Sequence, residues 1–207
     1  NKLAGEVELI KSGIIYRRLR DSLELNVNYY VQGTVLETEL YLISPFQVKY
    51  TITDPSLYNR KFNVNFLENK RLKVSSVGQG RTTGGEYEVG KPIKLPGIEL
   101  LITTTPNFTA EAYDLDYHFT IEDEATVNNY LDRNLAVEIV NPEANTIQIA
   151  FTDYNSVKAQ HIVDKIDTVY LQEKLARKQE ATVQTLNFLD QQLEENRRNL
   201  QVAEEIG

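Results

Sequence analysis

One strand-like segment carries three side chains that can bind a metal, and they alternate with apolar residues. The three are Asp114, Asp116 and His118. Successive side chains of a strand point to opposite faces, so these three would share one face and the apolar residues between them would be buried. Carboxylate and imidazole groups are both metal ligands. The same pattern is more often the solvent-facing side of an edge strand, which is the interpretation we favour, and we expect no metal site.

The glycine-rich segment 78–85 superficially resembles a phosphate-binding loop. A phosphate cradle needs a glycine loop that leads into a helix, and a Walker loop also needs a lysine followed by serine or threonine. Here the lysine is missing, and Tyr87 and Val89 predict a strand in place of the helix. We therefore expect a mobile hairpin loop and no bound cofactor.

The remaining residues give no catalytic constellation. With two histidines and no cysteine, hydrolysis would have to depend on paired carboxylates, and 30 acidic residues make some pair inevitable. We expect His161 to lie on the solvated side of a helix. Tyr29 and Tyr30 have rings that can stack on sugars, although tyrosines in strands are more often core or interface residues. We expect this chain not to be an enzyme.

The composition is that of an ordinary globular protein, with 41% hydrophobic and 25% charged residues in a chain of 207. The net charge is −8, and no dense basic cluster is present to replace the counterions of a nucleic acid, which is therefore not an expected partner. The absence of cysteine excludes disulfides and thiolate metal sites. No apolar run approaches the ~20 residues that span a bilayer.

The apolar pattern changes its period along the chain. Residues 3–25 carry an apolar stripe at helical spacing. From residue 46 the period becomes two, which predicts half-buried strands in a small antiparallel β module. The alternating segments are 46–52, 62–66, 72–74, 87–89, 98–102 and 115–121. A short helix is expected at 122–131, two more strands at 135–139 and 147–151, and a long helix from about Ser156, with Asn155 as its N-cap.

The far end of the last helix has a narrower apolar seam. Its leucines fall on alternating steps of three and four residues, which is the spacing of a coiled coil, and charged residues flank them. The expected interface residues are Leu186, Leu189, Leu193, Glu194, Arg197, Arg198 and Leu200. A seam on so long a helix needs a partner helix, supplied either by a downstream segment of a longer chain or by a second subunit.

The sequence therefore predicts an α+β fold. Residues 1–45 and 120–170 would form a mixed α/β base, 46–119 an inserted antiparallel β module, and 171–207 a projecting helix that begins a coiled-coil arm. The chain starts at Asn1, contains no Met and stops at Gly207 within a helical pattern, so we expect it to be part of a longer protein.

Several segments resemble the bacterial polysaccharide co-polymerases, the Wzz-like chain-length determinants. The first helix resembles the family's through GEVELIKS at 5–12 and LEL at 23–25, and YLISPFQV at 41–48 is similar to forms from Bacteroidetes-type bacteria with a long insert. TIQIAFTDYNSVKA at 146–159 resembles the final strand and the start of the long helix, and TLNFLDQQL at 185–193 resembles the start of the arm. One departure is that Tyr154 and Ser156 stand where the family usually has prolines.

The resemblance implies an inner-membrane protein whose periplasmic domains form a ring through self-association. Its partners would be a polysaccharide polymerase or an outer-membrane export channel, and the glycan is a further candidate partner. Its function would be to regulate the length and export of capsular polysaccharide, exopolysaccharide or O-antigen. The insert favours the subclass that carries a cytoplasmic tyrosine autokinase, which is not within this chain. The alternatives are a periplasmic adaptor of a secretion or efflux system, a carbohydrate-active enzyme and a non-catalytic sugar-binding module.

Overall fold

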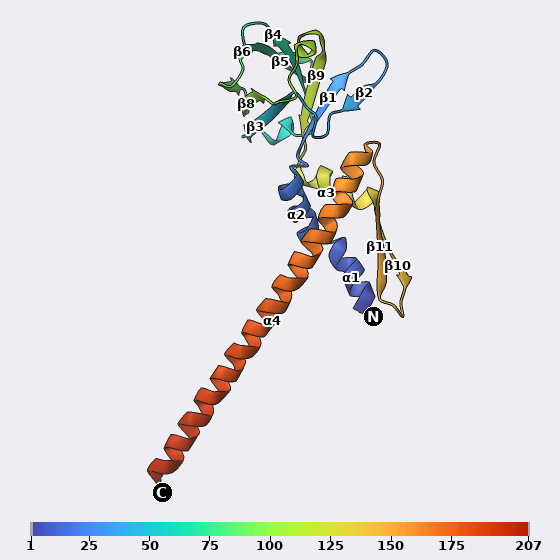
Figure 1. Cartoon of the computed structure of the whole chain (residues 1–207). Coiled ribbons are helices and arrows are strands. Elements are labelled where there is room, and N and C mark those ends of the chain that lie inside the picture. The colour runs from blue at the N-terminus through green and yellow to red at the C-terminus, as the bar shows by residue number, and fades with distance from the viewer. Residues whose placement is uncertain (1, 207) are drawn as a thin grey trace.

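The computed structural model describes residues 2–206 and shows the expected α+β fold (Figure 1). Within this range the first half of the chain forms α1 (Lys2–Ile10), α2 (Gly13–Leu23), β1 (Val27–Gln32), β2 (Glu37–Glu39), β3 (Phe46–Ile52), η1 (Pro55–Leu57), β4 (Lys61–Leu67), β5 (Arg71–Gly78), β6 (Arg81–Glu88), β7 (Pro92–Leu95) and β8 (Ile98–Thr104). The second half forms η2 (Ala110–Asp114), β9 (Asp116–Ile121), α3 (Glu124–Asn134), β10 (Leu135–Asn141), β11 (Thr146–Phe151) and α4 (Ser156–Ile206).

Nine strands form a β module of two packed sheets. One sheet has the order β2-β1-β9-β4-β5-β6, the other has the order β3-β8-β7, and all neighbours are antiparallel. The alternating apolar residues fill the space between them, with Phe46, Phe62 and Phe119 fully buried at the centre. This confirms the period-two pattern from residue 46 onward as strands with one buried face.

Strands β1 and β2 were not expected from the sequence. β1 pairs with β9 along its whole length, from Val27 opposite Ile121 to Gln32 opposite Asp116, and β2 then closes that edge. The six-stranded sheet therefore takes up residues 27–39, which the sequence analysis grouped with the base. The division into base, insert and arm remains a prediction.

The first helical segment is two helices, not one. Ser12 has extended backbone angles, and its hydroxyl accepts a hydrogen bond from the Ile15 amide, so it caps a new helix after α1 ends at Ile10. Serine competes for backbone hydrogen bonds in this way and favours helix starts over helix interiors. The prediction of one continuous helix over 3–25 was wrong at this point.

The glycine-rich segment is not a loop. β5 and β6 stay paired from Arg71 opposite Glu88 to Gly78 opposite Arg81, and only Gln79 and Gly80 form the turn, both with positive φ. Positive φ at both central residues is typical of a tight two-residue hairpin, which continues the twist of its strands. The expected mobile hairpin loop over 78–85 is thus corrected to a paired strand.

A second apolar core lies where α1, α2, α3 and the first part of α4 meet. It is made by fully buried residues such as Ile15, Leu19, Leu131, Ile162 and Ile166. The β10–β11 ribbon lies beside α1 and α4, on the opposite side from the β module (Figure 1). From this body α4 runs outward to the C-terminus as a single helix of 51 residues, about 75 Å at 1.5 Å per residue.

Candidate interaction surface on the projecting helix

The first part of α4 is fixed to the body by caps, packing and ion pairs. The Asn155 side chain accepts a hydrogen bond from the Lys158 amide at 3.0 Å, which confirms Asn155 as the N-cap. Ile162, Ile166 and Val169 are buried against the base. The last buried residue is Glu173, whose carboxylate lies 2.7 Å from Arg18 Nη2 and 3.1 Å from Arg177 Nε. These contacts set the direction in which the rest of the helix leaves the body.

Beyond Glu173 every described residue of α4 is exposed. The four seam leucines expected from the sequence lie in this part, with exposed fractions of 56% at Leu186, 50% at Leu189, 65% at Leu193 and 65% at Leu200. Residues three and four apart in a helix lie on one face, so the four side chains form one stripe along α4. Full burial of a leucine side chain stabilises a protein by about 1.5–3 kcal/mol, so a partner helix that covered these half-exposed side chains would add part of this amount for each of them.

The charged residues expected beside the seam are also exposed. Glu194 and Arg198 form a pair one helical turn apart, with 3.7 Å between Oε1 and Nε. Among residues 2–206, Arg197 has no ion-pair partner. An exposed pair of this kind contributes only about 0.3–0.5 kcal/mol, so its value would lie in selecting the register of a partner helix rather than in holding α4 together.

One further position of the seam was missed from the sequence. Leu175 is 56% exposed and lies seven residues before Thr182 and fourteen before Leu189, so it continues the same stripe toward the body. The heptad spacing could have identified it. Near this point Lys174 lies 2.8 Å from Glu6, so α1 contacts α4 where the exposed stripe begins.

The three potential metal ligands are not brought together. Asp114 lies in η2, Asp116 accepts a hydrogen bond from Asn65, and His118 is buried. The His118 ring stacks on Tyr30 at 4.7 Å between ring centroids, and its Nε2 lies 3.3 Å from Glu37 Oε1. Within residues 2–206 no group of three His, Asp or Glu side chains is placed to hold a metal ion.

Two histidine predictions are corrected by these contacts. β9 is an inner strand, flanked by β1 and β4, so its second face is not the solvent side of an edge strand. Burial lowers the pKa of the His118 imidazole, although the nearby Glu37 carboxylate opposes that shift. His161 is half-buried rather than solvated, and its Nδ1 lies 3.3 Å from the Tyr41 hydroxyl.

No helix among the described residues is both long enough and apolar enough to span a membrane. No protein-family profile matches the chain. A crystal structure of FlgL from Xanthomonas campestris gives a TM-score of 0.27 at 11% identity, covering 70% of this chain and 40% of that one, a likeness too low to bear on the fold.

The sequence relatives are more informative. The tyrosine-protein kinase wzc of Salmonella typhimurium is 27% identical over 210 aligned residues, which cover 97% of this chain and 28% of the relative. Its counterpart in Salmonella typhi gives the same identity and coverage. The chain thus spans little more than a quarter of the relatives it matches, and over nearly its whole length it is similar to one segment of these kinases.

Proposed function

We propose that this chain is the periplasmic segment of an inner-membrane polysaccharide co-polymerase of the tyrosine-kinase type. In this role it regulates the chain length and the export of capsular polysaccharide, exopolysaccharide or O-antigen. The observation that carries the proposal is the 27% identity to the wzc kinases, which extends over 97% of the chain. The α+β body with one projecting helix supports a scaffold role within a larger protein.

In this proposal the segment itself makes and breaks no bond. The matched region is 28% of each wzc kinase, so the phosphotransfer chemistry named for those relatives would belong to another part of the parent protein. The partners of the segment would be copies of itself and a polysaccharide polymerase or an outer-membrane export channel.

The stripe on α4 is the proposed route to self-association. A helix whose apolar seam has no cover is stabilised by a second helix that packs its own seam against it. The contacts of α4 with the body, from its start to Glu173, keep the arm at a fixed angle to the body. Pairing of two arms would therefore also fix the relative positions of the two bodies. A defined oligomer would then present a repeated surface to the growing glycan.

The test is the solution mass of the chain, measured by light scattering over a concentration series. We expect a defined oligomer, and we expect the double variant Leu193→Asp, Leu200→Asp to reduce it to the monomer. The double variant Phe188→Asp, Val202→Asp is the matched control, because it adds the same two charges at residues that are 59% and 54% exposed but lie off the seam. A strict monomer at every concentration, or an equal response to all the substitutions, would contradict self-association through this stripe.

A further inference from the structure

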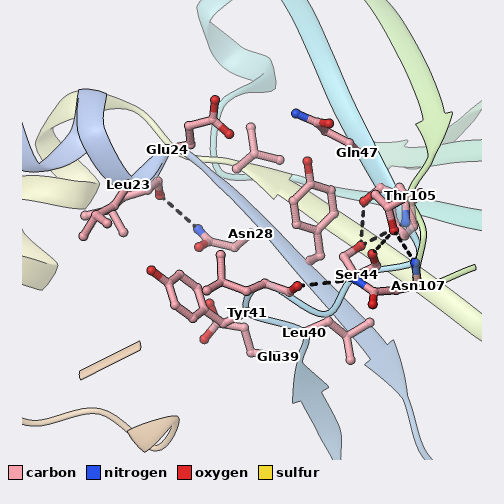
Figure 2. Close-up of a pocket in the computed structure, with 15 residues that line it drawn as sticks. Leu23, Glu24, Asn28, Glu39, Leu40, Tyr41, Ser44, Gln47, Thr105 and Asn107 are labelled. Carbon is pink, nitrogen blue, oxygen red and sulfur yellow. Dashed lines mark hydrogen bonds between the residues drawn. The ribbon is translucent and has the colours of Figure 1, made fainter. Parts of the chain in front are cut away.

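An extended groove lies at the junction of α2 with the β module, and Figure 2 shows the first of its two cavities. It consists of two adjoining cavities of about 300 and 350 Å³. Glu24, Val27, Tyr29 and Gln47 line both cavities, so the two are continuous and Tyr29 lies between them. Their volumes lie in the range of small-molecule sites, and the continuity gives space for a chain rather than for a single compact ligand.

We propose that this groove binds an uncharged stretch of a glycan chain. The inference deepens the proposed function, on which it rests, by naming a contact between the segment and its polysaccharide. It is argued from three features of the groove: polar groups without partners, an immobilised aromatic ring, and the distribution of charge.

Two side chains at the mouth of the groove have free hydrogen-bonding capacity. Among residues 2–206, neither the Glu24 carboxylate nor the Gln47 amide makes a hydrogen bond or ion pair. Glu24 is held in place because its backbone caps α2 in the left-handed conformation, with φ 50°. Gln47 is held by β3, whose partner across the ladder is Thr103. Together they offer acceptors and donors of the kind that sugar hydroxyls require.

The Tyr29 ring is held at the centre of the groove. Its hydroxyl oxygen accepts a hydrogen bond from the Val48 amide at 2.9 Å, and its ring packs edge-on against Phe46 at 5.1 Å. Burial raises the pKa of the Tyr29 hydroxyl to about 12, so it keeps its proton for a further hydrogen bond. A half-buried tyrosine combines an apolar face, which packs against the C–H groups of a sugar ring, with a polar group at its tip.

The wall opposite α2 is already formed without a ligand. The Ser44 hydroxyl donates to the Phe46 carbonyl at 2.7 Å and accepts from the Phe46 amide at 3.2 Å. The Thr105 hydroxyl donates to the Ser44 carbonyl at 2.6 Å, which ties the loop before β3 to the end of β8 (Figure 2). A preformed wall lowers the ordering cost of binding.

The charges in the groove select an uncharged ligand. The first cavity has two carboxylates, Glu24 and Glu39, and no lysine or arginine in its lining, and Glu39 is already paired with Lys158 at 2.7 Å. In the second cavity Arg20 is buried and paired with Glu124 at 3.2 Å, and Lys49 is exposed. The unpaired Glu24 carboxylate at the mouth of the groove therefore repels phosphate and uronate groups, which disfavours nucleotides and acidic sugars there.

The test is chemical-shift mapping on the isotope-labelled chain with cellohexaose, maltohexaose and hexagalacturonate as probes. We expect at least one of the two neutral hexasaccharides to shift the resonances of residues in the groove at millimolar concentration, and hexagalacturonate to bind more weakly. Gln47→Ala should weaken that binding about tenfold through its lost hydrogen bonds. Gln148→Ala, an exposed glutamine on β11 far from the groove, is the matched control and should leave binding unchanged.

Three results would overturn the inference. They are no shift with either neutral probe, stronger binding of hexagalacturonate, or equal shifts of the Glu24 region with calcium chloride alone, which would indicate a cation site. Light scattering on the same samples separates this inference from the proposed function. Gln47→Ala is expected to leave the oligomer intact. An oligomer that binds no neutral glycan would contradict the groove inference alone. A monomer that still binds glycan in the groove would contradict self-association alone.

Discussion

The Nζ atom of Lys158 lies 2.7 Å from Oε1 of Glu39, and this pair joins the long helix to the β module. The Lys158 side chain is only 6% exposed and that of Glu39 is 18% exposed. Lys158 Nζ also lies 3.4 Å from Asn28 Oδ1 and 4.9 Å from the centre of the Tyr130 ring. The two apolar cores of the molecule are therefore connected by a buried polar contact, in which Lys158 is the cation that neutralises the carboxylate.

Lys158→Met should lower the free energy of unfolding by about 3 kcal/mol, because removing one partner of a buried ion pair leaves the other charge without compensation. Urea unfolding followed by circular dichroism measures this change. Lys165→Met is the matched control, since Lys165 lies on the same helix without an ion-pair partner among the described residues, and it should cost less than about 0.5 kcal/mol. Equal effects of the two substitutions would show that the pair does not stabilise the junction.

His118 gives a second prediction, which concerns pH. Burial lowers its pKa in the folded protein, while the imidazole of the unfolded chain titrates near pH 6.5. Below that pH the unfolded state binds more protons than the folded state, so the free energy of unfolding should decrease as the pH falls from about 7 toward the folded-state pKa. The Lys61 ammonium, which pairs with Glu37, further disfavours protonation of His118.

The measurement is urea unfolding of the native chain and of His118→Phe at several values between about pH 5 and 8. Phenylalanine keeps an aromatic ring on Tyr30 but does not titrate, so the decrease in stability with falling pH should be smaller in the variant. The difference between the two curves isolates the histidine from carboxylates that titrate in both proteins. Parallel curves would mean that His118 titrates as it does in the unfolded chain.

The adjacent residues Gly84 and Gly85 on β6 should respond differently to alanine. Gly84 has φ 148°, and a Cβ atom there would overlap the carbonyl oxygen of Val74 on β5. Gly85 lacks a positive φ, and its added Cβ would make ordinary contacts with the Tyr87 ring. Gly84→Ala should cost about 2 kcal/mol or more, whereas Gly85→Ala should be close to neutral. Thermal unfolding of the two variants checks this, and equal melting temperatures would contradict the strand geometry described for β6.

Local patterns predicted the parts of the fold that depend on local chemistry. The alternation at 46–52 and 115–121 predicted β3 and β9, and Asn155 predicted the start of α4, because side-chain periodicity and capping are set within a few residues. Long-range pairing was not predictable in the same way. β1 buries the polar residue Asn28, so the sequence of β1 lacks the apolar face that identifies a strand. The buried Asn28 side chain is hydrogen-bonded by Lys158, which lies 130 residues further along the chain.

The candidate sites also differ in whether they depend on local or on long-range contacts. The stripe on α4 follows from heptad spacing alone, and the structure adds only that its residues are exposed. The groove could not be predicted, because it brings together the end of α2, β1, the loop before β3 and Asn107 after β8. The burial of His118 was also missed, since it depends on Tyr30 and Glu37 from the hairpin that covers that face of β9.

The last prediction uses the absence of cysteine from the chain, because a single introduced cysteine is then the only thiol that can form a disulfide. If two α4 arms pair in parallel and in register, the two copies of a seam residue face each other at a separation that a disulfide can bridge. Leu189→Cys should then give a covalent dimer under mild oxidation. Phe188→Cys is the matched control, because Phe188 is adjacent to Leu189 and similarly exposed, at 59%, but lies off the seam.

Non-reducing electrophoresis at several protein concentrations distinguishes the possible arrangements of the arm. A dimer from Leu189→Cys and little from Phe188→Cys supports a parallel pair of arms that meet along the stripe. Equal cross-linking of both variants would indicate random collision of exposed helices. No cross-linking of either, in a chain whose mass is that of an oligomer, would contradict parallel pairing, since antiparallel arms bring Leu189 opposite a different seam position in the partner.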